Sequence, residues 1–291
     1  MTYRELLCEG DEHLKKAGVL EAETDARLLL EYAGQMDRTA FFLKSMQEAP
    51  ADTVLSFRAL IRKRESRMPL QHILGFQEFM GFEFHCDARA LVPRQDTEIL
   101  AENALAILKS RMAETEDNAG HDLRVLDLCT GSGCIGISLK LLCPDAEVVC
   151  SDISDDALEL AKENADKLGA EVELRRSDLM NDIPGKFDLI LSNPPYIRED
   201  VIDTLQAEVC RFDPRMALSG GEDGLFFYRR ICSDAPEKLR EGGYLLFEIG
   251  SDQAEEVRAL MKAARFSALS IIKDLGGNDR VVLGQMRNHH V

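Results

Sequence analysis

Four consecutive residues, Asn193-Pro194-Pro195-Tyr196, combine groups that could hold a planar amide or amine. Asn193 offers a carbonyl acceptor, the two prolines offer carbonyls without a competing N–H, and Tyr196 offers a flat ring for stacking. The apolar run 187–191 before them predicts a buried strand, which the prolines must end. We therefore predict a stiff loop at the carboxyl end of a strand, where open α/β sheets bind ligands. A plain turn with an asparagine cap is the alternative.

A glycine-rich turn earlier in the chain has the spacing of a nucleotide-binding loop. Residues 131–136, Gly-Ser-Gly-Cys-Ile-Gly, match the pattern G-x-G-x-x-G and follow the predicted strand 124–128. Asp152 ends the next predicted strand about twenty residues later, where a carboxylate can accept hydrogen bonds from ribose hydroxyls. Strand, turn, helix, strand and acid in this order predict a bound nucleoside. The alternative is a packing loop with a capping aspartate.

Three further residues narrow the choice of nucleoside. A dinucleotide would place its pyrophosphate at the helix N-terminus, where the nearby Asp127 would repel it. The same carboxylate suits a cationic amino group, such as that of S-adenosylmethionine. Asp178 and Leu179 follow a third predicted strand, so Asp178 could accept from the exocyclic amine of adenine while Leu179 covers its face. A surface turn is the alternative for Asp178.

The predicted elements bring these motifs to one edge of a sheet. From residue 124 onward strands alternate with helices, which predicts a mainly parallel sheet with right-handed crossovers and helices on both faces. The polar residues 111–122 predict a surface loop before this sheet begins.

The first part of the chain has a different pattern. Residues 1–67 predict helices, with Gly10 and Gly18 as breaks, suited to partner contact or to a merely stabilising role. From Pro69 onward, alternating residues and glycine turns predict a β-hairpin. Asp96 or Thr97 is predicted to cap the helix that follows, and the charges of Arg94, Asp96 and Glu98 could instead form the wall of a site.

Charge and composition exclude several classes of protein. The 291 residues carry a formal net charge of -17 at pH 7, which argues against nonspecific binding to the phosphates of DNA or RNA. A basic cluster at residues 58–67 could be a local exception, but a solvated helix face is the preferred interpretation. No apolar run approaches membrane-spanning length, and the eight cysteines show no zinc-ligand spacing. We expect a cytoplasmic protein with reduced thiols and no metal.

The motifs also occur in the order and spacing of a known family. They comprise residues 69–75, 79–81, 92–98, 125–133, 152–154, 157–158, 192–197, 212–214, 217–218, 220–225, 228–229, 242–244, 248–250, 274–275 and 278–280. With these segments the chain resembles the protein-(glutamine-N5) methyltransferases of the PrmC/HemK family, which modify class 1 peptide chain release factors. Cys129 departs from the pattern because the family usually has glycine there, which raises the question of its backbone conformation.

The resemblance implies a fold and a division into domains. It implies a class I S-adenosylmethionine-dependent methyltransferase, with a Rossmann-like, seven-stranded, mostly parallel sheet, in residues 91–291. A helical substrate-binding domain is expected in residues 1–67 and a β-hairpin linker in residues 68–90. Class 1 release factors are the expected partners. The protein is expected to be a monomer that binds neither a membrane nor nucleic acid directly. Residues 288–291 have no assigned role.

The same resemblance implies an activity and its site. The enzyme would transfer a methyl group from S-adenosylmethionine to N5 of the glutamine in the GGQ motif of release factors, supporting translation termination and leaving S-adenosylhomocysteine. Substrate would lie against Asn193, Pro194, Pro195 and Tyr196, of which Asn193, Pro194 and Tyr196 are expected to be catalytic. The predicted cofactor-binding residues are Asp127, Cys129, Thr130, Gly131, Ser132, Gly133, Asp152, Asp178, Leu179 and Asn193.

The expected mechanism uses positioning rather than a strong base. The Asn193 side-chain oxygen and the Pro194 carbonyl would accept both amide hydrogens, which can contribute on the order of several kcal/mol. Because adenine-N6 DNA methyltransferases also use Asn-Pro-Pro-Tyr, adenine in DNA or RNA is a competing substrate. A nicotinamide-dependent dehydrogenase and a non-catalytic nucleoside-binding module are the two rival functions of a different class.

Overall fold

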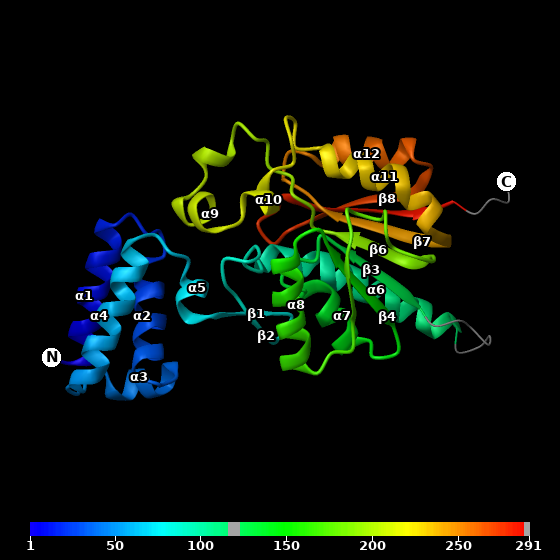
Figure 1. Ribbon diagram of the computed structural model, residues 1–291. Coiled ribbons are helices and arrows are strands. Elements are labelled where there is room, and N and C mark those ends of the chain that lie inside the picture. Colours follow the sequence, from blue (N-terminus) through cyan, green and yellow to red (C-terminus); the bar gives the residue numbers. More distant parts are fainter. Residues whose placement is uncertain (116–122, 288–291) are drawn as a thin grey trace. The chain divides into compact units, whose positions relative to one another are not determined.

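The computed structural model describes residues 1–115 and 123–287, and the chain forms two compact units (Figure 1). One unit comprises Met1–Phe76 with Gln206–Phe212, and the other comprises Gln77–Leu205 with Asp213–Val291. The short segment 206–212 therefore belongs to the N-terminal unit, although in the sequence it lies between two parts of the larger one. The predicted loop 116–122 and the tail 288–291 lie outside the described residues.

The smaller unit consists of helices around an apolar core. Its helices are α1 (Tyr3–Lys16), α2 (Ala22–Ala33), α3 (Arg38–Lys44), α4 (Ala51–Glu65), α5 (Leu70–Leu74) and α9 (Ala207–Phe212). A capping box of Thr2 and Glu5 begins α1, in agreement with the local sequence. The prediction of a break at Gly10 was wrong, because Gly10 lies inside α1. A Cβ there would come within 2.5 Å of the Phe57 ring, so glycine permits close packing of α1 on α4.

Buried ion pairs hold α9 in this unit. Glu208 accepts hydrogen bonds from Arg64 at 2.8 Å and from Arg67, and Arg64 also pairs with Asp25 at 2.7 Å. Burial alone would raise the pKa of Glu208, but the bonds from Arg67 and Arg64 outweigh burial and lower it to about 2. These two arginines of the basic cluster thus have internal carboxylate partners.

The larger unit contains a twisted sheet and a separate hairpin. Within the described residues the sheet has the order β5-β4-β3-β6-β7-β9-β8, with parallel pairing from β5 to β7 and antiparallel pairing of β9 with β7 and β8. Its strands are β3 (Arg124–Leu128), β4 (Glu147–Asp152), β5 (Glu173–Arg176), β6 (Phe187–Ser192), β7 (Leu239–Glu248), β8 (Phe266–Lys273) and β9 (Asp279–Met286). The predicted seven-stranded, mostly parallel sheet is confirmed.

Helices cover both faces of this sheet (Figure 1). They are α6 (Gln95–Thr115), α7 (Cys134–Leu142), α8 (Asp155–Leu168), α11 (Phe226–Lys238) and α12 (Ala254–Ala263). The larger unit also contains the short 3-10 helix η1 (Ile202–Thr204) and the short helix α10 (Arg215–Leu218). Leu126 of β3 packs in one core with α11 and α12, whereas Val125 packs in another with α6 and α7. This alternation is expected for a strand buried on both faces. None of the described helices has the length and apolar character needed to cross a bilayer.

Three local predictions need correction. The hairpin strands β1 (Phe76–Phe79) and β2 (Phe82–His85) form as predicted, but the residues before them form helix α5 and not β-structure. Helix α6 begins at Gln95, so Asp96 and Thr97 lie in its first turn and do not cap it. The same helix continues to Thr115, which replaces the first part of the predicted loop 111–122.

Candidate active site

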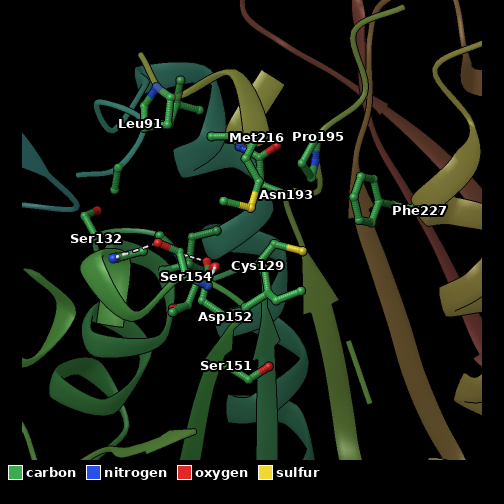
Figure 2. A pocket seen from close by; sticks show the side chains of 18 of the residues that line it. Leu91, Cys129, Ser132, Ser151, Asp152, Ser154, Asn193, Pro195, Met216 and Phe227 are labelled. Carbon is green, nitrogen blue, oxygen red and sulfur yellow. Dashed lines mark hydrogen bonds between the residues drawn. The ribbon is translucent and has the colours of Figure 1, made fainter. Parts of the chain in front are cut away.

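A cavity of about 330 Å³ lies at the carboxyl ends of β3, β4 and β6 (Figure 2). The predicted site residues that line it are Cys129, Thr130, Gly131, Ser132, Asp152, Asp178, Leu179, Asn193 and Pro195. Asp127, Gly133, Pro194 and Tyr196 lie outside this lining. The parallel strands thus bring both sequence motifs to one site, as expected for the ligand edge of an open α/β sheet.

The loop after β3 is held by the end of β4. The Thr130 N–H donates to the Ser151 carbonyl and the Gly131 N–H donates to the Asp152 carboxylate, each at 3.0 Å. Cys129 and Gly131 have φ values of 58° and 56°, which are in the left-handed region. Because that region favours glycine, the structure explains why a family pattern would place glycine at position 129.

The Asp152 carboxylate faces the cavity from the end of β4 (Figure 2). Its second oxygen accepts the Ser154 N–H at 3.0 Å, and the Ser154 hydroxyl caps α8. Burial raises the pKa of Asp152, and the N–H bonds from Ser154 and Gly131 oppose the rise. An oriented, half-buried carboxylate at this position can accept hydrogen bonds from vicinal hydroxyls.

Asp127 lies beneath the loop and is completely buried. One of its oxygens accepts from the Thr130 hydroxyl at 2.6 Å and from the Gly136 N–H at 2.9 Å. Its other oxygen has no hydrogen-bond partner among the described residues. Burial raises the pKa of Asp127 to about 7, although both hydrogen bonds oppose the rise. The contact of Asp127 with a cationic amino group stays a prediction, since the carboxylate supports the loop from below.

Asp178 and Leu179 form another part of the wall. The Asp178 carboxylate makes two hydrogen bonds to Arg230, at 2.8 and 2.9 Å, and the Arg230 guanidinium lowers the pKa of Asp178. Leu179 is 5% exposed, belongs to the apolar core and lines the cavity. Its φ of 53° is in the left-handed region. The ion pair was not predicted, and it holds the Asp178 carboxylate, which is 44% exposed, at the start of a turn beside the cavity.

The Asn193 side chain lies across the cavity from Asp152, beside Pro195 and Met216 (Figure 2). The preceding residue is fixed by a hydrogen bond from the Ser192 hydroxyl to the Leu128 carbonyl at 2.8 Å. The Asn193 amide nitrogen donates to the Thr97 hydroxyl at 3.3 Å. The carbonyl oxygen of Asn193 is therefore the atom left to accept from a ligand.

Tyr196 is anchored away from the cavity lining. Its hydroxyl donates to the Glu248 carboxylate at 3.4 Å, and its backbone carbonyl accepts from the Gln253 side chain at 3.0 Å. A Cβ on Gly224 would come within 2.5 Å of the same carbonyl, so only glycine fits against this turn. Burial raises the pKa of the Tyr196 hydroxyl, which stays neutral. The predicted stacking of its ring on a substrate remains a prediction, as does the role of the buried Pro194.

Several lining residues were not predicted from sequence. They are Arg89, Ala90, Leu91, Val92, Pro93, Thr97, Ser151, Pro214, Met216, Ala217, Phe226, Phe227 and Arg230. The motifs around 92–98 and 212–218 could be recognised in the sequence. Their spacing along the chain, however, does not predict that they lie at the edge of the sheet. An ion pair joins these two walls, because Arg94 donates to the buried Asp213 at 2.9 Å. Burial raises the pKa of Asp213 to about 6, with Arg94 opposing the rise.

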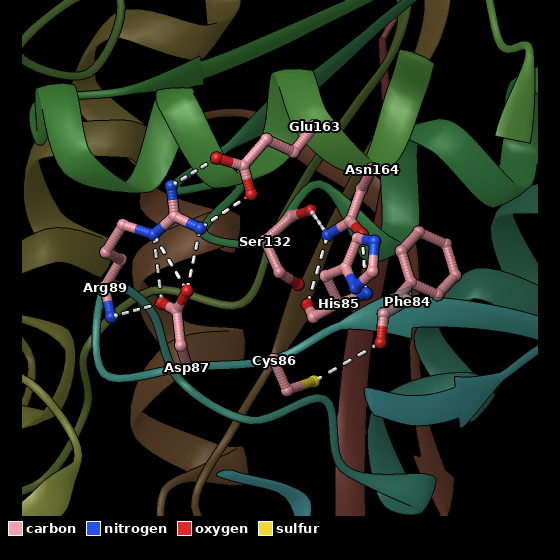
Figure 3. A network of polar contacts seen from close by, with 8 residues as sticks. All are labelled: Phe84, His85, Cys86, Asp87, Arg89, Ser132, Glu163 and Asn164. Carbon is pink, nitrogen blue, oxygen red and sulfur yellow. Dashed lines mark hydrogen bonds and ion pairs between the residues drawn. The ribbon is translucent and has the colours of Figure 1, made fainter. Parts of the chain in front are cut away.

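A polar network supports the loop 129–133 through Ser132 (Figure 3). The buried Asn164 of α8 accepts the His85 N–H at 2.6 Å and donates to the Ser132 carbonyl at 3.0 Å. Arg89 pairs with both Asp87 and Glu163 at 2.7 Å. The hairpin end, α8 and the loop are thus joined before any ligand binds, which lowers the entropy cost of binding.

Two family models match the chain. The model described as PrmC N-terminal domain matches residues 5–75, and the model described as methyltransferase small domain matches residues 102–222. The first lies within the helical unit and the second includes the loop, Asp152 and Asn193.

Curated relatives match over nearly the whole chain. The release factor glutamine methyltransferase of Clostridium botulinum is 39% identical over 97% of this chain and 98% of its own. That of Agrobacterium fabrum is 41% identical over 95% of this chain and 94% of its own. Among solved structures, the hMettl16 catalytic domain in complex with MAT2A 3′UTR hairpin 6 has a TM-score of 0.57 at 15% identity, over 80% of this chain and 83% of that one. This last likeness concerns the fold alone.

Proposed function

Because the chain belongs to the release factor glutamine methyltransferase family, we propose that it methylates the side-chain amide nitrogen of the GGQ glutamine in class 1 peptide chain release factors. S-adenosylmethionine is the proposed methyl donor, and S-adenosylhomocysteine is the product. One observation carries the proposal beyond family membership. A single cavity joins the loop 129–133 and Asp152 to the carbonyl acceptor of Asn193.

The residues of the cavity fit the proposed methyl donor. When bound, S-adenosylmethionine supplies an electrophilic methyl carbon on a sulfonium centre. Asp152 would accept from the ribose hydroxyls, and Asp178 with Leu179 would hold the adenine by its amine and its face. The backbone of Cys129 to Ser132 would line the remainder, with Asp127 adding negative charge beneath it. This arrangement of acids suits a cationic nucleoside better than the pyrophosphate of a dinucleotide.

The proline-rich loop would position the substrate. An amide nitrogen is a poor nucleophile because its lone pair is delocalised. The Asn193 side-chain oxygen and the Pro194 carbonyl would accept the two amide hydrogens and hold the nitrogen in line with the methyl carbon. Such positioning can supply on the order of several kcal/mol without a general base. In this proposal Asn193 and Pro194 contact the reacting amide, and Pro195 and Tyr196 shape the rim.

We also propose that the helical unit contacts the release factor. Two consecutive residues of α3, Phe42 and Leu43, are 79% and 75% exposed, and adjacent exposed apolar side chains are typical of an interaction surface. The net charge of -17 supports a protein substrate rather than a nucleic acid. A monomeric, cytoplasmic enzyme without metal remains part of the proposal.

Transfer of a labelled methyl group tests this function. The enzyme is incubated with labelled S-adenosylmethionine and, separately, with a class 1 release factor, duplex DNA and RNA. We expect label in the release factor only. Label in nucleic acid with none in the release factor would contradict the proposal and favour adenine as substrate. Calorimetry with NAD and with S-adenosylmethionine provides the ligand control, with heat expected only for the second.

A further inference from the structure

Arg230 of α11 makes a two-pronged ion pair with Asp178 at the wall of the cavity. Both residues line the cavity, and Asp178 follows shortly after the end of β5. The guanidinium donates to one carboxylate oxygen at 2.8 Å and to the other at 2.9 Å. The Asp178 side chain is 44% exposed, so packing alone does not fix its orientation. The paired hydrogen bonds therefore determine where its two oxygens point.

The guanidinium of Arg230 is itself ordered by its own helix. The Phe226 ring lies one helical turn earlier in α11, and the guanidinium carbon of Arg230 is 5.6 Å from the centre of that ring. Phe226 in turn meets the Phe227 ring edge to face, with the ring centres 5.2 Å apart. A guanidinium over an aromatic ring is attracted to it, which restricts a long side chain. The ion pair is thus ordered before a ligand binds.

This geometry leaves acceptor positions on Asp178 for a ligand. A carboxylate has about four lone-pair positions on its two oxygens, and a bidentate guanidinium occupies one on each oxygen. No other hydrogen bond to the Asp178 carboxylate is found among the described residues. Its remaining lone pairs are acceptors with fixed directions at the cavity. Such acceptors bind an amino group and repel a carbonyl oxygen.

We propose that Arg230 is a positioning residue that makes the nucleoside site selective for adenine, because its two hydrogen bonds direct the Asp178 carboxylate toward the exocyclic amine of the base. The inference rests on the proposed function, in which Asp178 contacts adenine. It adds the residue that orders this contact and the feature of the base that is recognised. Hypoxanthine has a carbonyl oxygen where adenine has the amine, so the ordered carboxylate should reject hypoxanthine.

Arg230 should affect binding of the methyl donor and not the transfer step. In the sheet, β4 and β3 lie between β5, which precedes Asp178, and β6, which precedes Asn193. The base and the reacting amide would therefore be held by separate elements. An interaction made equally with the bound donor and with the transition state changes the Kd for the donor and leaves kcat unchanged.

Calorimetry with two nucleosides tests the proposal on the full chain. S-adenosylhomocysteine carries adenine, and S-inosylhomocysteine carries hypoxanthine on the same ribose and amino acid. We expect the wild-type protein to bind the first at least about tenfold more tightly. Arg230→Gln should raise the Kd for S-adenosylhomocysteine about tenfold and change the Kd for S-inosylhomocysteine about twofold or less. With saturating S-adenosylmethionine and a class 1 release factor, kcat should change about twofold or less.

Arg229→Gln is the matched control for loss of an exposed ion pair. Arg229 is the neighbouring residue of α11, and it pairs with Asp223, with both side chains about half exposed. Exposed ion pairs contribute little to stability, so Arg229→Gln and Arg230→Gln should change the melting temperature equally little. Only Arg230→Gln should change the Kd for S-adenosylhomocysteine. A merely structural role of Arg230 would not alter the preference between two bases.

Two further variants separate geometry from charge. Arg230→Lys keeps the positive charge but cannot form two parallel hydrogen bonds, so its Kd for S-adenosylhomocysteine should stay raised about fivefold or more. Adding Arg230→Gln to Asp178→Asn should cause no further loss of affinity, because Arg230 acts through Asp178.

Three results would overturn the inference: wild-type Kd values for both nucleosides in Arg230→Gln, wild-type affinity in Arg230→Lys, or a further loss in the double variant. Equal affinity of the wild-type protein for the two nucleosides would remove the adenine contact and the inference with it. A wild-type enzyme that fails to methylate the release factor would instead contradict the proposed substrate, because the calorimetric measurements use no release factor.

Discussion

The carboxylate of Asp152 accepts the backbone N–H of Gly131 at 3.0 Å, so the acid that ends β4 fixes the loop that follows β3. Its other oxygen fixes the start of α8 through the Ser154 N–H at 3.0 Å. Asp152 thus orders the floor of the cavity before a nucleoside arrives. Its predicted contact with ribose adds a ligand to a carboxylate that already has a structural role.

Replacement of Asp152 should weaken binding of the methyl donor. Hydrogen bonds to a charged group contribute about 1.5–3 kcal/mol, so Asp152→Ala should raise the Kd for S-adenosylmethionine by about tenfold or more in calorimetry. Asp155→Ala is the matched control, because that carboxylate is exposed and pairs with Arg176. Equal affinities for the two variants would show that Asp152 does not contact the ligand.

The left-handed backbone at Cys129 predicts an unusual pattern of stabilities. With a φ of 58°, Cys129→Val should lower the free energy of unfolding by about 1–2 kcal/mol, since β-branched residues fit this region poorly. Cys129→Gly should stay within about 1 kcal/mol of wild type, because relief of strain offsets the added freedom of the unfolded chain. Urea unfolding measures both.

Cys143→Val serves as the control for the valine substitution, since Cys143 has an ordinary φ of -136°. If Cys129→Val were as stable as the wild type, the loop would not have the described conformation.

The parts of the site that depend on neighbouring elements of the chain could be predicted from the sequence. The loop 129–133 and Asp152 could be predicted because parallel neighbouring strands end at one edge, and β3 pairs with β4 in that way. The left-handed φ of Cys129 follows from no pattern in this one sequence and needed the structure. Helix α5 was missed because five residues are too few to show a helical period.

Long-range contacts explain the rest of what sequence could not predict. Thr97 is far from Asn193 along the chain, and only tertiary packing brings the two side chains together. The predicted capping role of Thr97 arose because a threonine before a helix is a common cap, whereas here its hydroxyl serves Asn193. The family resemblance indicated which segments of the sequence form the site, and the structure shows which contacts these segments make.

The exposed apolar pair on α3 predicts a defect confined to substrate binding. Replacing both Phe42 and Leu43 with serine should raise the KM for the release factor about fivefold or more, because a buried aromatic or leucine side chain contributes about 1.5–3 kcal/mol. The kcat and the Kd for S-adenosylmethionine should stay unchanged. Leu275→Ser, at a fully exposed position of the larger unit, should have no effect. An unchanged KM in the double variant would remove α3 from the substrate surface.

The ion pairs of Glu208 predict a pH-dependent stability. The pKa of Glu208 is lowered from 4.5 to about 2, so its contribution is present above about pH 4.5 and is lost as the pH falls towards 2. Glu208→Gln should lower the free energy of unfolding at pH 7 by on the order of 2–3 kcal/mol. The difference from wild type should shrink below about pH 4.5.

Urea unfolding at several pH values measures this difference. Glu199→Gln, at an exposed position, is the control and should match wild type throughout. A pH-independent difference would mean that packing rather than charge accounts for the effect of Glu208.

The central claim is that Asn193 holds a glutamine amide beside the methyl donor, and mass spectrometry of the release factor after reaction tests it most directly. The wild-type enzyme should place one methyl group on the GGQ glutamine. Asn193→Ala should leave that glutamine unmodified while its Kd for S-adenosylmethionine, measured by calorimetry, rises about threefold or less. Methylation of the same glutamine at the wild-type rate by Asn193→Ala would contradict the account.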